Sequence, residues 1–459
     1  MKLIDAGAYK GRVLVALRQL LQLDGPTAGQ FVAAAPIDLA GGLTEEMAER
    51  LRTTLVGAGA LVEVQAPPRK PPPAAPRPPK PEPLRSMGEI ASQIRQPAAR
   101  RGPRTLTGLA LGRGCSYLAY GRVEGSRLLG PPDFIRLDAW AMIPTAVRLA
   151  ASGTTEVCGN RALQSWVRNP EEVSLGFTEE LGLDDGAALP AARAFLKFLN
   201  YRLVEVLGPG AADAGEGAAT SVAVSSGRDQ SVARLLVEVA EQAGFPVAQL
   251  VPEPLAAVAS TLLQNAGQRP PQARHYLVID WGSQGLDLAT VEDIPNACGP
   301  GVIDHVEHPL GGIWLDMILE GWLTERLPGE LVDEDRRALT LFARQFKENA
   351  SASFADGRAE HVQYCVLPAG LPPTRISIKR GEMDELFHDA QAQFQAAVEE
   401  APGRVGFKPE HFDEVVMVGG ASRCYFVPEA VRKALGRAPV VVSNPEEAIA
   451  RGLVFWGVR

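Results

Sequence analysis

The amino-acid sequence predicts an α/β protein in which a small α+β domain precedes a much larger α/β domain. The chain has 459 residues, which is more than one simple core usually contains. After residue 105, apolar strands that end in glycine-containing turns alternate with helical segments, and a proline-rich stretch separates this part from residues 1–66. Apolar residues make up 46% and charged residues 22% of the chain, which excludes a disordered, collagen-like or coiled-coil protein.

The same sequence argues against export, membrane insertion and disulfide bonding. No apolar run reaches the ~18 residues of a spanning helix, and the N-terminus has no secretory apolar segment. The five cysteines lie far apart and form no Cys-x-x-Cys pair: Cys115, Cys158, Cys298, Cys365 and Cys424. We therefore expect a cytoplasmic protein with no membrane contact, no disulfide framework and no thiolate metal cluster.

Residues 1–66 predict a compact α+β unit. Apolar spacing predicts helices over 11–21, 27–34 and 44–55, and the last of these places Met47, Leu51 and Leu55 on one face. Thr44 is expected to cap that helix, with glutamates in its first turn. Residues 61–65, Leu-Val-Glu-Val-Gln, follow the Gly57-Ala-Gly-Ala segment and predict a strand.

Residues 67–104 predict a linker. Ten of the 37 prolines fall between Pro67 and Pro83, which excludes helix or central strand and indicates a semi-rigid polyproline-II spacer. A motif that docks to a proline-binding partner is the alternative. The linker has a net charge of +7, compared with −1 for residues 1–66 and −14 for residues 105–459. Its basic side chains are able to lie on the acidic body or to contact an anionic partner such as RNA.

Two strand–turn–strand segments in residues 105–459, at 106–120 and 276–287, indicate phosphate-binding turns. Glycine in such a turn lets the backbone approach a phosphate closely, and the backbone N–H groups are able to face it. A carboxylate beside the turn, here Asp280, is able to hold Mg²⁺ through its water ligands.

Other segments of the same part predict the elements around these turns. Residues 230–243 and 427–435 predict helices, and a buried strand at 412–418 runs into a Gly-Gly turn. Asn444 is expected to cap the last helix, with Pro445 at its first position.

Together these segments resemble the nucleotide-binding domain of the heat-shock-70 chaperones, within the actin and hexokinase superfamily. The matching motifs follow the family's order and cover residues 105–459: Ile143-Pro144-Thr145, Asn169-Pro170-Glu171, Glu253-Pro254-Leu-Ala-Ala, Leu310-Gly311-Gly312-Ile-Trp-Leu-Asp316, Phe342 to Ser351, Val418-Gly419-Gly420-Ala-Ser-Arg423 and Asn444-Pro-Glu446-Glu-Ala-Ile-Ala. The resemblance implies a two-lobed, actin-like α/β fold that binds ATP or ADP, with Mg²⁺ as a possible cofactor. The chain stops at Arg459, soon after the last motif, so we expect no β-sandwich substrate-binding domain.

The resemblance also implies roles for individual residues. The phosphate-binding positions are Gly112, Arg113, Gly114, Gly282, Gly285 and Gly312. The positions on the adenosine side are Lys347, Ser351, Gly419, Gly420, Arg423 and Glu446. Asp280 and Glu253 match the family's carboxylates near the metal and the attacking water, and Asp280 is the candidate Mg²⁺ ligand, through water.

The chain departs from the family at three catalytic positions. Ala110 stands where the family has an aspartate, Arg113 where it has a threonine, and Thr178 where it has the catalytic lysine. We therefore expect weak or absent ATP hydrolysis. One hypothesis is that the charge of Arg113 replaces Mg²⁺ near the β- and γ-phosphates.

Two further departures lie on the helix expected to contact adenosine. Arg344 occupies the family's glutamate position, and Glu348 occupies its arginine position. In the second turn, both aspartates remain while two glycines and a threonine are lost. The domain is thus expected to bind nucleotide weakly or to be a purely structural relative of a nucleotide-binding domain.

Residues 1–66 resemble the C-terminal domain of the bacterial ribosomal large-subunit stalk protein, through residues 12–18, 31–36, 43–49 and 57–63. In that family the domain recruits translation GTPases through a lysine-rich helical face. Here the matching stretch at 22–29 has no lysine, and only Lys10 and Arg18 keep the charge. A general protein-docking domain is the alternative interpretation.

Two histidines are weak candidates for metal ligands. His305 and His308 lie beside Asp304 and Glu307, but a solvated loop before Leu310 is the favoured interpretation.

The leading hypothesis is a bacterial, cytoplasmic, heat-shock-70-like protein with a degenerate nucleotide-binding domain, a nucleotide-sensing or scaffolding module that acts through protein partners. One alternative is an active chaperone-type ATPase. The other is a translation-linked adaptor that binds the ribosome or RNA through residues 1–104.

Overall fold

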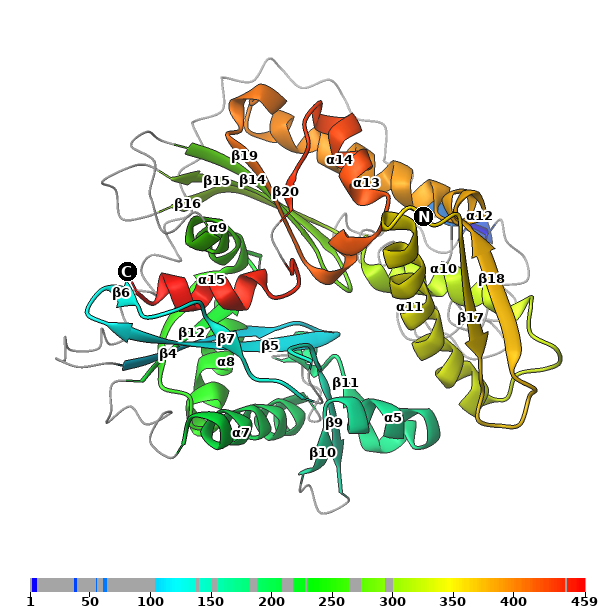
Figure 1. Ribbon diagram of the computed structural model, residues 1–459, viewed down its shortest axis with the longest axis horizontal. Coiled ribbons are helices and arrows are strands. Elements are labelled where there is room, and N and C mark those ends of the chain that lie inside the picture. Colours follow the sequence, from blue (N-terminus) through cyan, green and yellow to red (C-terminus); the bar gives the residue numbers. More distant parts are fainter. Residues whose placement is uncertain are drawn as a thin grey trace. The chain divides into compact units, whose positions relative to one another are not determined.

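The computed structural model describes residues 2–5, 37–38, 55, 61–63, 104–137, 140–150, 155–181, 188–208, 218–227, 229–264, 274–293, 300–441 and 444–458 (Figure 1). The chain divides into two units, Met1–Glu82 and Pro83–Arg459, and each is described by itself. The helices predicted at 11–21 and 27–34, most of the helix at 44–55, and the linker at 67–103 lie outside the described residues.

The described part of the first unit is a three-stranded antiparallel sheet. Its order is β2-β1-β3, with β1 at Lys2–Asp5, β2 at Ile37–Asp38 and β3 at Leu61–Glu63. The predicted strand at 61–65 is confirmed over its first three residues, whereas β1 and β2 were not predicted. Leu55 is helical and fully buried, as its place on the predicted helix face requires.

The second unit contains two mixed sheets, one in each lobe. The sheet of the first lobe, which we define as residues 104–252, has the order β13-β12-β4-β5-β6, and β7 and β8 also pair with β5. The strands are β4 (Arg104–Leu111), β5 (Cys115–Glu124), β6 (Arg127–Leu128), β7 (Asp133–Phe134), β8 (Ile143–Pro144), β12 (Ala219–Val224) and β13 (Val247–Pro252). β12 runs parallel to β4 and β13, whereas β4 and β5 form an antiparallel hairpin. The predicted strand–turn–strand at 106–120 is this hairpin.

Helices and a small sheet complete the first lobe. The helices are α5 (Asn160–Arg168), α6 (Phe177–Glu180), α7 (Ala188–Leu207) and α8 (Gln230–Gln242). The small sheet has the order β10-β9-β11, formed by β9 (Ala146–Leu149), β10 (Thr155–Cys158) and β11 (Val173–Leu175). α8 begins where predicted because the Asp229 carboxylate accepts the backbone N–H of Ser231 at 2.7 Å, which satisfies one of the unpaired N–H groups at the helix start.

The second lobe, residues 274–441, is built on a sheet of order β16-β15-β14-β19-β20. Its strands are β14 (Arg274–Trp281), β15 (Leu286–Asp293), β16 (Gly301–His308), β19 (Glu414–Val418) and β20 (Val440–Val441). Its helices are α10 (Gly312–Thr324), α11 (Asp333–Ala355), α12 (Arg380–Leu386), α13 (His388–Arg404) and α14 (Val427–Leu435), and β17 (Glu360–Cys365) pairs with β18 (Thr374–Lys379). The hydrophobic core of this lobe contains Trp281, whose ring stacks on that of Phe394 with centroids 4.5 Å apart.

Two helices, α9 (Glu253–Gln264) and α15 (Ala448–Trp456), lie between the two sheets (Figure 1). They pack so closely that a Cβ added at Gly452 would lie 1.8 Å from the carbonyl oxygen of Ala256. On the other side of α15, a Cβ at Gly108 of β4 would lie 2.2 Å from the carbonyl oxygen of Ala450. Backbone therefore meets backbone on both sides of α15.

The predicted α/β, two-lobed, actin-like fold is confirmed by this arrangement. One boundary was wrong: α15 begins at Ala448, and Asn444 lies in the turn before it, with a left-handed φ of 53°. Asparagine tolerates this conformation better than most residues. Among the described residues, no helix is both long enough and apolar enough to cross a membrane.

The close packing of α15 gives a stability prediction. We expect Gly452→Ala to lower the free energy of unfolding by at least about 2 kcal/mol, because its Cβ would force α15 away from α9. Denaturant unfolding checks this. The control is Gly381→Ala in α12, where a Cβ meets nothing within 4 Å and stability should stay equal or rise by up to about 1 kcal/mol. Equal stability of the Gly452→Ala variant and the wild type would contradict the prediction.

Candidate functional site

The two predicted phosphate-binding turns meet at the junction of the lobes. The first turn, at 112–114, joins β4 to β5, and the second, at 282–285, joins β14 to β15. A Cβ added at Gly114 would lie 3.3 Å from both Cβ and Oγ of Ser283. The structure thus brings together Gly112, Gly114, Gly282 and Gly285, the glycines on which the predicted phosphate site is built.

The first turn is held by a buried threonine from the neighbouring chain segment. The Thr145 hydroxyl donates to the carbonyl oxygen of Gly112 at 2.7 Å, and the Thr145 backbone N–H donates to that of Gly114 at 3.1 Å. The Ser116 hydroxyl lies 2.8 Å from the Thr145 hydroxyl. Two carbonyl groups of the turn are therefore occupied by one residue, which fixes the turn's orientation.

The second turn is packed against the start of α10. The backbone N–H of Gly312 donates to the carbonyl oxygen of Gly282 at 3.0 Å, and a Cβ at Gly311 would lie 2.3 Å from Cα of Gln284. The Gly-Gly pair of the motif is thus needed for close packing here. This contact places Gly312 beside the turn, as predicted.

Three carboxylates gather beside the second turn. Asp280, at the end of β14, pairs across the hairpin with Asp287 of β15, and Glu253 opens α9. Burial raises the pKa of Asp280 well above its ordinary value, and the negative charges of Glu253 and Asp287 raise it further. The two predicted catalytic carboxylates, Asp280 and Glu253, therefore lie close enough to interact.

His305 joins this carboxylate group from β16. Its Nε2 lies 2.8 Å from Oδ1 of Asp287, and its ring lies near Gly227, where a Cβ would be 3.7 Å from Cε1. Burial lowers the pKa of His305, but the hydrogen bond and the charge of Asp287 outweigh it, so the pKa is raised. The expected solvated loop was wrong, because residues 301–308 form a strand and the His305 side chain is only 11% exposed.

The Arg113 side chain lies against Gly176. A Cβ added at Gly176 would lie 3.1 Å from Arg113 Nε and 3.2 Å from its Cγ. Gly176 has a left-handed φ of 70° and precedes Thr178 by two residues. The Arg113 side chain thus lies beside the position of the family's catalytic lysine.

The predicted adenosine contacts on α11 are buried inside the second lobe. Nζ of Lys347 lies 2.6 Å from Oδ1 of Asp316 and donates to the carbonyl oxygen of Gly312 at 3.0 Å. Both side chains of this ion pair are at most one-tenth exposed, and Ser351, one turn further along α11, is 3% exposed. Lys347 therefore ties α11 to α10 and to the glycine motif.

The Gly-Gly turn after β19 leaves space on one side only. A Cβ at Gly419, whose φ is 85°, would lie 2.4 Å from both Oδ1 of Asp280 and the carbonyl oxygen of Trp281. A Cβ at Gly420 would meet nothing within 4 Å. Gly419 is thus required for packing, and Gly420 faces open space where a ligand is able to approach the backbone.

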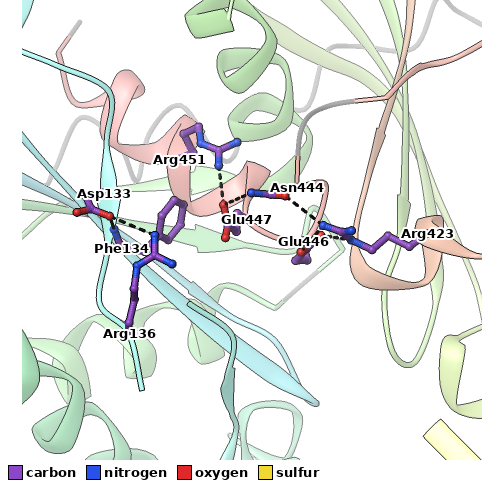
Figure 2. A network of polar contacts seen from close by, with 8 residues as sticks. All are labelled: Asp133, Phe134, Arg136, Arg423, Asn444, Glu446, Glu447 and Arg451. Atoms are coloured by element: carbon purple, nitrogen blue, oxygen red, sulfur yellow. Dashed lines mark hydrogen bonds and ion pairs between the residues drawn. The ribbon is translucent and has the colours of Figure 1, made fainter. Parts of the chain in front are cut away.

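Figure 2 shows how Arg423 is held beside this turn. Its guanidinium forms two hydrogen bonds of 2.7 Å with the carboxylate of Glu446 and one of 3.2 Å with Asn444 Oδ1. The network continues to Glu447, which accepts from Asn444 at 3.0 Å and from Arg451 at 2.6 Å. Both predicted residues, Arg423 and Glu446, come together as an ion pair on the rim of the site.

From the sequence, Arg344 is recognised only as a residue that differs from the glutamate of the related family. In the structure its side chain lies between the two lobes. From α11 its Nη2 reaches Sγ of Cys115 at 3.3 Å and Sδ of Met142 at 3.9 Å, both in the first lobe. Its Nε donates to Glu348 at 3.0 Å, which shows that the exchanged arginine and glutamate positions pair with each other. The exchange of arginine and glutamate between positions 344 and 348 is the sequence feature that could have predicted this ion pair.

The fold and these turns define the class: a two-lobed, actin-like α/β domain that resembles the nucleotide-binding domain of the heat-shock-70 proteins. The family model described as Hsp70 protein matches residues 231–457. The chaperone protein DnaK of Thermotoga neapolitana is 25% identical over 366 residues, which cover 76% of this chain and 58% of that protein. The DnaK of Thermus thermophilus is 29% identical over 221 residues, 46% of this chain and 34% of that protein.

These matches support the Hsp70-type nucleotide-binding domain that the motifs predict. The chain spans little more than half the length of the first of these curated relatives, as the 58% coverage shows. The comparisons bear on the large domain, and the resemblance of residues 1–66 to a ribosomal stalk domain stays a prediction.

The residues of the site fit a nucleotide better than they fit a metal ion. The two turns converge, and the backbone at Gly420 faces open space that such a ligand is able to enter. In the described part of the chain, no group of three or more His, Cys, Asp or Glu side chains is arranged to hold a metal ion, and Ala110 supplies no carboxylate. The role of Asp280 as a water-mediated Mg²⁺ ligand stays a prediction.

The raised pKa of Asp280 makes stability depend on pH. A carboxyl group whose pKa is raised by folding binds its proton more tightly in the native state, so its contribution is present in acid, below its ordinary pKa of 3.8, and is lost as pH rises through the raised value. We expect Asp280→Asn, which carries no charge, to be more stable than the wild type at pH 8 by at least about 1 kcal/mol. The advantage should shrink toward pH 4 in thermal melts. Asp356→Asn, at an exposed site, is the control, and a pH-independent difference would contradict the prediction.

The buried Lys347–Asp316 pair gives a second prediction. Lys347→Ala should cost about 3 kcal/mol or more, because it leaves the Asp316 carboxylate buried without its cation. The double variant Lys347→Met with Asp316→Leu should recover most of this loss, since both charges are removed together. Denaturant unfolding measures both, and a double variant no more stable than the single one would contradict this account.

Proposed function

We propose that this chain is a chaperone-like, nucleotide-binding protein with reduced catalytic equipment that acts through protein–protein contacts. The observation that carries the proposal is that the site keeps the features expected to bind a nucleotide but lacks two residues expected to catalyse its hydrolysis. The glycine turns, the Gly420 opening and the carboxylates Asp280 and Glu253 are assembled, while the positions of the family's catalytic aspartate and lysine hold Ala110 and Thr178.

The chemistry of hydrolysis explains why this contrast points to binding without turnover. Phosphoryl transfer needs a positioned metal ion and a group that orients the attacking water, in addition to backbone that holds the phosphates. The residues that remain are able to orient a ligand and exclude water, but the lysine charge and the metal-side carboxylate are missing. Nucleotide then serves to bias the angle between the lobes rather than to be consumed.

Protein partners follow from the same proposal. The relatives are chaperones, and a movement of the lobes affects other molecules only where a protein partner binds one lobe arrangement more tightly than the other. The basic segment before residue 105 and the first unit provide a candidate docking part, with the ribosome or RNA as a possible anionic partner. Cosedimentation of the full chain with ribosomes at low and high salt tests that partner.

A restoring variant tests the loss of catalysis. We expect the full-length wild type to bind ATP in calorimetry yet to show almost no turnover in a phosphate-release assay. The triple variant Ala110→Asp, Arg113→Thr, Thr178→Lys restores the family's residues and should raise turnover at least about tenfold with Mg²⁺ present. The variant with Thr178→Lys alone is the control, because it lacks the metal-side carboxylate. Substantial turnover by the wild type would favour the active-ATPase alternative, and no ATP binding would leave only a scaffold.

A further inference from the structure

We propose that Arg344 is the cation that receives the phosphate groups of a bound nucleotide, in place of a metal ion. This inference rests on the proposed nucleotide binding and names the residue that carries it. In the related family the corresponding position is a glutamate, so the role belongs to this chain's own side chain.

The position of Arg344 is the first support. Its side chain crosses from α11 of the second lobe to the first turn of the first lobe, where Nη2 contacts Cys115 Sγ at 3.3 Å. A Cβ added at Gly114 would lie 3.7 Å from Nη1. The guanidinium thus lies beside the glycine turn that is expected to face phosphate.

The acceptors around Arg344 are the second support. Five N–H groups belong to the guanidinium, and the acceptors that the structure shows are one oxygen of Glu348 and two sulfur atoms, of Cys115 and Met142. Sulfur is a weak acceptor, whereas phosphate oxygens match the planar fork of a guanidinium in pairs and carry charge. One third of the Arg344 side chain is exposed, so exchanging sulfur for phosphate needs no large rearrangement.

Two other cations of the site have stronger existing partners. Lys347 is buried against Asp316, and Arg423 makes two short hydrogen bonds with Glu446. Moving Lys347 would leave a buried carboxylate without its cation, and moving Arg423 would break two charge-assisted hydrogen bonds. Of these three cations, Arg344 is therefore the one that changes partners at the lowest cost.

The first turn agrees with this assignment, because Ala110 supplies no carboxylate beside it. A guanidinium at the turn supplies positive charge without a metal ion, so nucleotide binding should not require Mg²⁺.

The experiment is calorimetric titration of the full-length protein with ATP, adenosine and inorganic phosphate, each with Mg²⁺ and with EDTA. We expect the wild type to bind ATP equally well in both conditions. Arg344→Ala should weaken ATP binding by about tenfold to a hundredfold, the range for hydrogen bonds to charged groups, and should leave adenosine binding within about twofold. Arg344→Lys should keep part of the ATP affinity, because it keeps the charge without the fork.

A matched control separates phosphate binding from lobe closure. Arg168 of α5 also links the first lobe to α11, through Glu334 at 3.3 Å, but it is 73% exposed. Arg168→Ala should leave the affinity for ATP unchanged. Thermal melts confirm that each variant is folded, and Arg344→Lys serves as the second variant should Arg344→Ala unfold.

The remaining outcomes separate this inference from the proposed function. Wild-type binding of ATP that needs Mg²⁺, or equal ATP affinity in the wild type and in Arg344→Ala, would overturn the role of Arg344 and leave nucleotide binding standing. Inorganic phosphate binding as tightly as ATP would also overturn it, since the ligand would not be a nucleotide. Absence of binding to every ligand would overturn both.

Discussion

The contact of α15 with α9 and β4 is the constraint on which the rest of the site depends. At Gly452 the backbone of α15 meets the backbone of α9, and at Gly108 it meets β4. Side chains at such contacts would adapt by changing rotamer, but backbone atoms in van der Waals contact leave one separation only. β4 leads directly into the first turn, and α9 begins at Glu253. The packing of α15 therefore fixes the positions of both the first turn and Glu253.

Whether a cationic side chain of the site is able to bind an anionic ligand depends on how strongly it is already paired with a carboxylate. Four cations lie at positions that a nucleotide-binding domain uses, and two of them, Lys347 and Arg423, have carboxylate partners at 2.6–2.7 Å. A buried pair such as Lys347–Asp316 stabilises the fold only while both members remain, so it acts as part of the scaffold. The guanidinium of Arg344, which faces sulfur atoms, combines weaker contacts with a position at the turn. The difference in partner strength separates a structural cation from one that is able to bind.

The strands and turns could be predicted from the sequence, whereas the partners of the charged side chains could not. The hairpins around the two turns were predictable because apolar strands and glycine turns are local features, and α14 has the predicted bounds of Val427–Leu435 because Gly436 takes up a left-handed φ of 67°. The pairing of Lys347 with Asp316 depends on how α10 packs on α11, and spacing along the chain does not show it. His305 was misjudged for a related reason, since its strand is recognised only by its pairing with β15.

The substitutions redistribute charge within the site, which argues against simple loss of function. At the first turn, Ala110 removes a negative charge and Arg113 adds a positive one, whereas Thr178 removes a positive charge. Arg344 and Glu348 exchange the two signs of charge on one helix. Relaxed selection on an unused site would favour small or uncharged side chains, because bringing a guanidinium between two lobes costs solvation that sulfur contacts repay only in part. A guanidinium kept in that position is better explained by an anion that it meets for part of the time. Ala110 and Arg113 both make the first turn less attractive to a metal ion, so the missing carboxylate and the added guanidinium act in the same direction there.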